Sequence, residues 1–242
     1  MLLSLGGKTE EPLRRMYHSQ SPHQVVAFHR ESVVHGTMSS TKAFNNTVGV
    51  EKVVLRAKGL EQGPVLEAEV ELARNILRKK GAGAIEAISV VGLCGTAEDA
   101  PLLEMYLHGE GNNLYAEYAI KALCRYLGMT DQYRPLLRQW ITNRDDAFRR
   151  IAAIHLAKEY FRGYVDNALG RYLIDVLCDL EDNCRHAARS SLTDILNVRD
   201  RLNDPFGLVF ADWDDDATLI VEVAAAQFGY DVPTILHGRP IH

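Results

Sequence analysis

Two short stretches, Asp146-Ala147-Phe148-Arg149-Arg150-Ile151-Ala152-Ala153 and Asp182-Asn183-Cys184-Arg185-His186-Ala187-Ala188, decide the fold class. Each runs from an acidic residue through arginine into alanines, and the two start 36 residues apart. Self-similarity at such a period is typical of repeated supersecondary units. The sequence therefore predicts a repeated helical fold.

Apolar residues around these stretches recur at i, i+3, i+4, i+7 and i+8, which places them on one side of a helix. Four such sets follow one another at intervals of 32, 32 and 36 residues: Ala84, Ala87, Ile88, Val91, Gly92; Ala116, Ala119, Ile120, Leu123, Cys124; Phe148, Ile151, Ala152, His155, Leu156; and Cys184, Ala187, Ala188, Ser191, Leu192. These sets predict the second helix of each repeat.

A second family of stripes lies between the first, and it predicts the first helix of each repeat. Its members are Ala73, Ile76, Leu77; Leu103, Tyr106, Leu107; Leu137, Trp140, Ile141; and Leu173, Val176, Leu177. Glycines at 81, 95, 128 and 163 stand at the expected helix ends, and Thr96 with Asp99 is typical of a helix start. Pro101 and Pro135 are each expected in a first helical turn.

This series resembles the HEAT repeat family, whose second helix typically follows an acidic turn with an apolar residue, an arginine and then alanines. The two earlier repeats depart from that pattern, because Ile85 and Glu117 stand where the family has arginine. The resemblance covers residues 65–198 and implies an all-α fold, a right-handed α-solenoid of HEAT-like helix pairs, in which each pair buries its stripe against its neighbours.

The flanks are expected to cover the ends of this array. Residues 1–64 are expected to form a partly irregular N-terminal helical cap, with a helix from Ser21 to Val34. The segment Thr41–Lys58 suits a strand or a helix, and helix is preferred. Residues 199–242 are expected to hold a loop at 203–207, a helix from Ala217 to Phe228 and an irregular tail from Asp231.

The composition favours a globular protein that does not bind nucleic acid. The net charge is -5 and 47% of residues are hydrophobic, so the chain lacks the basic balance of a phosphate-backbone binder. No secretion signal or membrane span is recognisable, which predicts a cytoplasmic protein. Cys94, Cys124, Cys178 and Cys184 lack zinc spacing and are expected to be reduced core residues.

Known catalytic and cofactor motifs are incomplete in this sequence. The stretch from Gly36 to Lys42 lacks the second glycine and the hydroxyl residue of a phosphate-binding loop. The carboxylates from Asp212 lack the glycine and glutamate of a calcium loop, because Ala217 and Val223 stand at those positions. No cofactor, metal or catalytic residue is therefore predicted. His155 is expected to be a hydrogen-bonded core histidine forming a polar layer with Ser191.

Two groups of residues are candidates for binding a partner. The first is the acidic edge Asp212, Trp213, Asp214, Asp215 and Asp216; in one interpretation Asp216 caps a helix, and in the other the exposed tryptophan anchors a basic partner. The second is a charged stripe on the second helices, which in HEAT-like proteins usually line the concave face: Glu117, Lys121, Arg125, Arg149, Arg185 and Arg189. A solvated charged face is the alternative for this stripe.

These features predict a non-catalytic protein-binding scaffold. Its sharpest version, which rests on the size and acidity of the chain and on the absence of a cofactor motif, is an inhibitor or immunity protein of the toxin–antitoxin kind that neutralises a toxin or enzyme. The alternative is a HEAT-like enzyme, since that fold includes DNA alkylation-repair glycosylases and bilin lyases. The glycosylase alternative requires a basic groove with aromatic residues, whereas Trp140 lies in a core triplet and Trp213 among aspartates.

Overall fold

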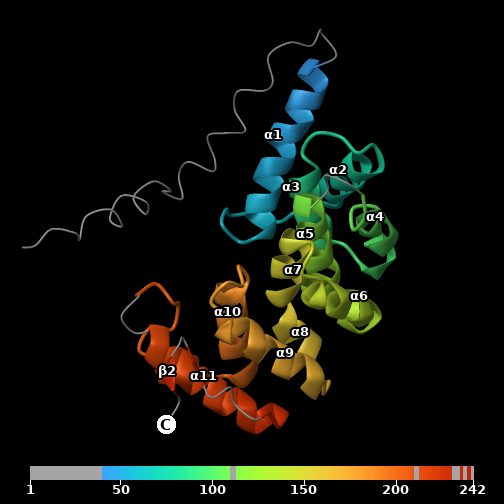
Figure 1. The fold of residues 1–242 in the computed structure, drawn as a ribbon. Helices are drawn as coiled ribbons and strands as arrows, with labels where there is room; N and C mark the ends of the chain where they lie inside the picture. Colours follow the sequence, from blue (N-terminus) through green and yellow to red (C-terminus); the bar gives the residue numbers. More distant parts are fainter. Residues whose placement is uncertain (1–39, 110–112, 210–212, 231–234, 237–238, 241–242) are drawn as a thin grey trace, which may run out of the picture. The chain divides into compact units, whose positions relative to one another are not determined.

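The structure is a computed structural model that describes residues 40–109, 113–209, 213–230, 235–236 and 239–240 (Figure 1). The helix expected from Ser21 to Val34 and the stretch 36–39 lie outside the described residues. Spatial contacts divide the chain into one unit at 1–42 and another at 43–242, and all described residues from 43 onward belong to the second unit. The expected division at residues 64 and 198 stays a prediction.

The segment Thr41–Lys58, whose sequence suits a strand or a helix, forms a helix, α1 (Ser40–Ala57). Val50, Val53 and Val54 are buried, as the helical spacing of three and four residues requires. At its end Arg56 forms an ion pair with Glu69 of α2 (Glu67–Arg78) and donates to the Pro64 carbonyl at 2.8 Å. These contacts join α1 to the helices that follow.

The described part of the chain is helical apart from one short strand pair, which confirms the all-α class (Figure 1). The expected first helices are α2, α4 (Ala100–Glu104), α6 (Thr130–Thr142) and α9 (Asn167–Cys178). The expected second helices are α3 (Ala84–Cys94), α5 (Asn113–Lys121) continued by the π-helical turn η4 (Ala122–Tyr126), α7 (Ala147–Ile154) and α10 (Arg185–Leu196). Along the chain α3 contacts α5, α5 contacts α7, and α7 contacts α10.

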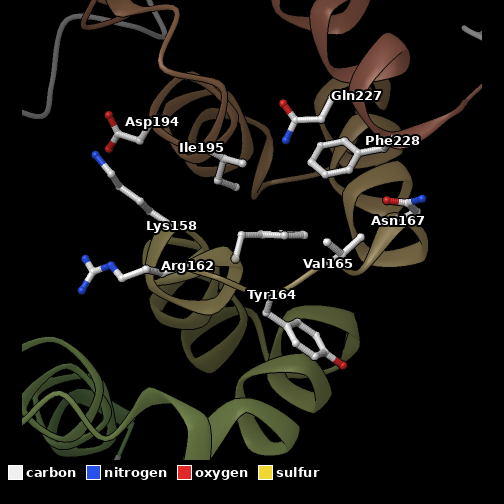
Figure 2. Close-up of a pocket in the computed structure, with 10 residues that line it drawn as sticks. Lys158, Arg162, Tyr164, Val165, Asn167, Asp194, Ile195, Gln227 and Phe228 are labelled. Carbon is white, nitrogen blue, oxygen red and sulfur yellow. The ribbon is translucent and has the colours of Figure 1, made fainter.

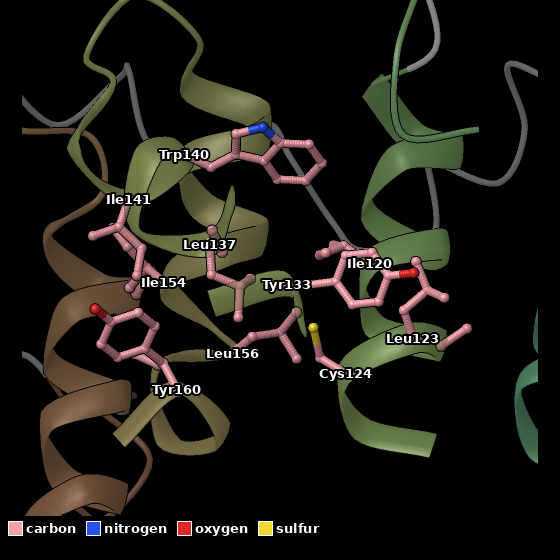
Figure 3. Packing of buried hydrophobic residues seen from close by; sticks show 14 of the residues in the cluster. Ile120, Leu123, Cys124, Tyr133, Leu137, Trp140, Ile141, Ile154, Leu156 and Tyr160 are labelled. Atoms are coloured by element: carbon pink, nitrogen blue, oxygen red, sulfur yellow. The ribbon is translucent and has the colours of Figure 1, made fainter. Parts of the chain in front are cut away.

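The predicted stripes form the core in all helices except α7. Every stripe residue of α2, α3, α4 with the turn after it, α5 with η4, α6, α9 and α10 with Cys184 is buried. Figure 3 shows how side chains of η4 and α6 gather in this interior with Ile154 of α7 and with Leu156, which precedes α8 (Ala157–Phe161). The repeated spacing therefore identified the buried faces of most helices.

In α7 the predicted stripe is buried only in part: Ala152 and Leu156 are buried and Ile151 is partly buried, but the other two members are not. Phe148 is 70% exposed and His155 is exposed, whereas Arg150 is only 3% exposed. The Arg150 guanidinium donates to both carboxylate oxygens of Asp182 at 2.8 and 2.7 Å, and also to the Ile141 carbonyl at 3.1 Å. Because these partners satisfy the buried cation, the helix turns its arginine inward instead of its phenylalanine.

The helix start at Thr96 is confirmed, since the Thr96 amide donates to Asp99 and the Glu98 amide donates to the Thr96 hydroxyl. These hydrogen bonds cap the start of the short 3-10 helix η3 (Ala97–Asp99), which leads into α4 with Pro101 in the first turn. The parallel expectation for Pro135 is wrong, because α6 starts at Thr130 and Pro135 lies inside it. Proline lacks the N–H that an interior position would donate to the preceding turn.

At the other helix ends the glycines have different roles. Gly95 caps α3, and Gly128 and Gly163 adopt left-handed φ values of 69° and 65° after η4 and after α8 (Ala157–Phe161). After α2 the left-handed residue is Lys80, with φ 48°, and not Gly81. All four cysteines are free; Cys124 and Cys184 are buried, and Cys94 and Cys178 are partly buried.

The C-terminal helix α11 spans Trp213–Phe228 and so starts earlier than the expected Ala217. It packs on α9 and α10, and Gly229 follows it with φ 62°. The tail was expected to be irregular, but β1 (Ile235–Leu236) pairs antiparallel with β2 (Arg239–Pro240).

Candidate protein-binding surface

Residues 203–209, here named the Phe206 loop, connect the 3-10 helix η5 (Arg199–Arg201) to the residues before α11. A loop was expected at 203–207, and the structure has one. Its apolar side chains are exposed: Phe206 by 73%, Leu208 by 84% and Val209 by 50%. Apolar side chains gathered in an exposed loop are typical of an interaction site.

The loop is folded around the carboxylate of Asp204, which is itself buried. This carboxylate accepts hydrogen bonds from the backbone N–H groups of Val209 and Phe206. The bond from Val209 is the largest cause of a lowered pKa of Asp204, so the carboxylate is charged near neutral pH. Gly207 completes the turn with a left-handed φ of 70°.

A buried ion pair lies beneath the loop. The Arg189 side chain is 3% exposed and its Nη2 donates to Asp216 at 2.9 Å and to the Asp204 carbonyl at 2.7 Å. Asp216 also accepts from the backbone amides of Asn203 and Asp204, at 2.8 and 2.9 Å. The ion pair thus binds the backbone at the start of the loop, at Asn203 and Asp204.

The tryptophan expected to be an exposed anchor is instead buried. Trp213 is 8% exposed, and the guanidinium groups of Arg185 and Arg189 each lie 5.1 Å from its ring. The His186 ring lies 4.4 Å away. Burial between cations and imidazole suits the electron-rich indole face, so this residue supports the loop and presents no free surface.

The other members of the acidic edge also differ from expectation. Asp216 does not cap the helix; it lies within the first turn of α11, 1% exposed, and binds Arg189. Asp215 is exposed, Asp214 is partly buried and makes contacts of its own, and Asp212 lies outside the described residues. The acidic edge is therefore mainly the support of the Phe206 loop.

The stripe on the second helices divides into two parts. Glu117, Lys121 and Arg125 line a pocket of about 240 Å³ together with His155, Ser190, Ser191 and Asp194. Arg125 is already paired, because it donates to both carboxylate oxygens of Glu159 on α8, at 2.5 and 3.1 Å. These three side chains therefore lie at one pocket, and their role in binding a partner stays a prediction.

The remaining three arginines of the stripe do not extend that surface. Arg149 binds Asp146 at 2.8 Å and lies 5.6 Å from the ring of Trp140. Arg185 donates to the Leu177 carbonyl at 2.8 Å. Arg189 was expected on the surface and is buried, because Asp216 and Asp204 provide its partners.

His155 was expected to be a core histidine with Ser191, and this is wrong. Its side chain is exposed at the pocket, and the buried Ser191 hydroxyl donates to the Ile154 carbonyl at 2.5 Å. Neighbouring protein atoms partly desolvate the imidazole, and this is the largest cause of a lowered pKa of His155. The negative charge of Glu117 raises this pKa, and the positive charges of Arg125 and Lys121 lower it. The imidazole is thus neutral near neutral pH.

Both tryptophans of the chain are buried, so neither is placed to stack on a nucleic-acid base. Among the described residues, no group of histidine, cysteine and acidic side chains has the arrangement of a metal site. No helix in that part of the chain is long and apolar enough to cross a membrane.

Comparison with known proteins gives no relative. No protein family, curated protein or solved structure matches the chain. The site is therefore interpreted from its own geometry.

The apolar residues of the Phe206 loop were not among the predicted site residues. The signal was present, since Phe206, Leu208 and Val209 follow Pro205 in a segment expected to be a loop. Apolar residues in a turn cannot all be buried by that turn itself, so they point either to the core or to a partner. In the structure these three side chains are exposed and are not part of the core.

Proposed function

We propose that this protein is a non-catalytic protein-binding scaffold and that the Phe206 loop is its main contact surface. The observation that carries the proposal is the contrast between the exposed apolar side chains of the loop and the buried Arg189–Asp216 ion pair that supports it. A loop held in one conformation loses little conformational freedom on binding, and apolar side chains on it then contribute more of their contact energy to affinity.

The right-handed HEAT-like solenoid remains the arrangement we propose for residues 65–198. It is supported by the alternation of two helix families and by the consecutive contacts α3–α5–α7–α10. Stacked helix pairs expose long surfaces for protein recognition.

The partner we infer is a basic protein, in the sharpest version a toxin or enzyme that this chain inhibits as an immunity protein does. The net charge of the chain is -5, and the exposed Asp215 follows the Phe206 loop in sequence. On the other side of the loop Asp200 lies between Arg199 and Arg201, so the acidic side is that of α11. Complementary charge around an apolar centre accelerates association and discriminates against other partners.

Affinity purification from the native host, followed by reconstitution of the purified pair, tests this function. Wild type and a Phe206→Ser/Leu208→Ser variant are compared, with Phe148→Ser as the matched control because Phe148 is 70% exposed on α7. We expect the double variant to weaken the reconstituted complex at least about 30-fold, the size of one interface hot spot. The control should bind like wild type.

Two results would overturn the proposal. One is the absence of any stable protein partner. The other is a partner that binds the double variant as tightly as it binds wild type. Loss of affinity between 50 and 300 mM salt, on the order of tenfold, is expected if the rim of the partner is basic.

A further inference from the structure

A second pocket is lined by residues outside the Phe206 loop. It has a volume of about 350 Å³ and lies between α8 with the loop after it, the start of α9, and the C-terminal ends of α10 and α11 (Figure 2). Its apolar lining comes from Phe161, Tyr164, Val165, Ile195 and Phe228. This volume lies at the small end of the range for ligand pockets.

The inner wall of the pocket is fixed by close packing. Phe228 is 3% exposed, and a Cβ at Gly170 would lie 2.3 Å from its ring, so the ring lies directly on the backbone of α9. The Phe161 ring lies 5.5 Å from that of Phe228. Arg171 of α9 donates to the Phe228 carbonyl at 3.2 Å and ties the end of α11 in place. An apolar wall therefore exists before any ligand arrives.

The outer wall is open to solvent. Val165 is 80% exposed and Tyr164 is 45% exposed, with the guanidinium of Arg134 4.3 Å from the Tyr164 ring. Exposure of valine beside a preformed apolar wall leaves surface that a ligand chain could cover.

Cations stand at one end of this pocket. Lys158 and Arg162 are exposed and extend to the same side, away from Asn167 and Phe228 (Figure 2). Within the described part of the chain neither of them forms an ion pair. The Asp194 carboxylate reaches this end too, but it is paired with Arg199 at 2.6 Å. The end therefore carries more positive than negative charge.

We propose that this pocket binds a small amphiphilic carboxylate of the medium-chain fatty acid class. The hydrocarbon chain would lie between Phe161, Val165 and Phe228, and the carboxylate would meet Lys158 and Arg162. Charge complementarity selects an anionic head over a cationic one, and the limited volume selects a medium chain. The pocket is lined by residues outside the Phe206 loop. Arg199 lies between the two sites, because it pairs with Asp194 and donates to the Pro205 carbonyl at 3.3 Å.

Three probes of equal chain length test the assignment on the full chain by calorimetry and by chemical-shift mapping: octanoate, 1-octanol and octylammonium. We expect octanoate to bind most tightly and octylammonium most weakly. Lengthening the acid by one methylene should tighten binding about threefold to fourfold while the pocket still has room.

Variants separate head from chain recognition. Lys158→Gln/Arg162→Gln should weaken octanoate binding about tenfold or more and leave octanol binding unchanged, whereas Lys58→Gln/Lys79→Gln, at exposed lysines on other elements, should change neither. Val165→Asp should weaken the binding of all three probes, because it places a charge beside the hydrocarbon chain. Its circular dichroism spectrum should be unchanged.

Equal affinity for octanoate, 1-octanol and octylammonium would overturn the proposal. So would chemical-shift changes confined to another part of the protein, or the absence of binding at millimolar octanoate. Leu208→Ser, at an 84% exposed side chain of the Phe206 loop, should weaken the protein complex and bind octanoate like wild type. Failure of this proposal and failure of the proposed protein-binding function are therefore distinguishable.

Discussion

At the scale of single residues, the buried ion pair of Arg150 and Asp182 shows how this fold tolerates charge in its interior. The two side chains are 3% and 2% exposed, and the Tyr172 hydroxyl lies 2.9 Å from the guanidinium as a further partner. A buried pair stabilises little relative to apolar residues, but removal of one partner leaves the other charge without compensation. Its importance is therefore visible only when it is broken.

Asp182→Asn is expected to lower the free energy of unfolding by about 3–5 kcal/mol, because it leaves the Arg150 cation buried without its counter-charge. Urea unfolding followed by circular dichroism measures this loss. The matched control is Arg78→Met, which breaks the exposed pair with Glu71, 47% and 45% exposed, and should cost within about 0.5 kcal/mol. Equal effects of the two substitutions would contradict the assigned burial.

The same aspartate predicts how stability depends on pH. Burial raises the pKa of Asp182, but the hydrogen bonds from Arg150 and from the Cys184 amide outweigh it, so the folded-state pKa is lowered. The pKa values of Asp99 and Asp166 are lowered as well, because hydrogen bonds again outweigh burial. Asp99 accepts them from Arg74 and Thr96. Asp166 accepts them from the Leu169 amide, Tyr160 and Arg138. A lowered folded-state pKa contributes stability that is present above the unfolded value, about 4, and is lost as pH falls through the folded value.

We therefore expect the urea midpoint to fall modestly from pH 7 to pH 5, because the folded state also lowers the pKa values of His155 and His186, and to fall steeply below about pH 4. Midpoints measured across this range check the prediction. In Asp182→Asn the fall should be shallower, since one of the titrating groups is absent. A midpoint that rises on acidification would be incompatible with these ion pairs.

At the scale of elements, the close approach of α3 to η4 depends on Gly92. A Cβ at this position would lie 2.7 Å from the Ala122 Cβ and 3.1 Å from a ring carbon of Tyr126. Alanine favours a helix over glycine, yet here it would force two elements apart. The stripe pattern placed Gly92 on the buried face, but its neighbour could not be read from spacing.

Gly92→Ala is expected to destabilise the fold by about 1–3 kcal/mol, the usual cost of overpacking. Gly49→Ala in α1 is the control, because nothing lies within 4 Å of its added Cβ and the helix should gain up to about 1 kcal/mol. Thermal and urea unfolding of both variants give the comparison. Stabilisation by both substitutions would show that α3 and η4 are not in contact as described.

The sequence predicted elements better than it predicted their ends and their polar partners. Apolar spacing found α3 and α10 and their buried faces, because burial of a stripe is a local property of one helix. It failed at Phe148 and Arg150, where the choice of face depends on Asp182, 32 residues away. It failed for Trp213 in the same way, since burial there requires Arg185 and Arg189 of another helix.

At the scale of the whole unit from 43 to 242, the contacts form a continuous series. Each second helix touches the next, and α11 packs on both α9 and α10. In such a series stability is approximately a sum of the stability of each repeat and of its interfaces, and long arrays lose cooperativity. A short series with buried ion pairs between elements should still unfold as one.

The chain has two tryptophans, Trp140 in α6 and Trp213 in α11, and these allow the cooperativity to be measured. In Trp213→Phe the fluorescence reports α6 alone, and in Trp140→Phe it reports α11 alone. Within each variant we expect the fluorescence midpoint in urea to coincide with the circular dichroism midpoint, because the interfaces between α6 and α11 are continuous. Comparing two probes within one variant removes the effect of the substitution itself on stability. An earlier transition at Trp213 would mean that α11 and the Phe206 loop separate from α9 and α10 before the rest unfolds, and the proposed binding surface would then be mobile and not preformed.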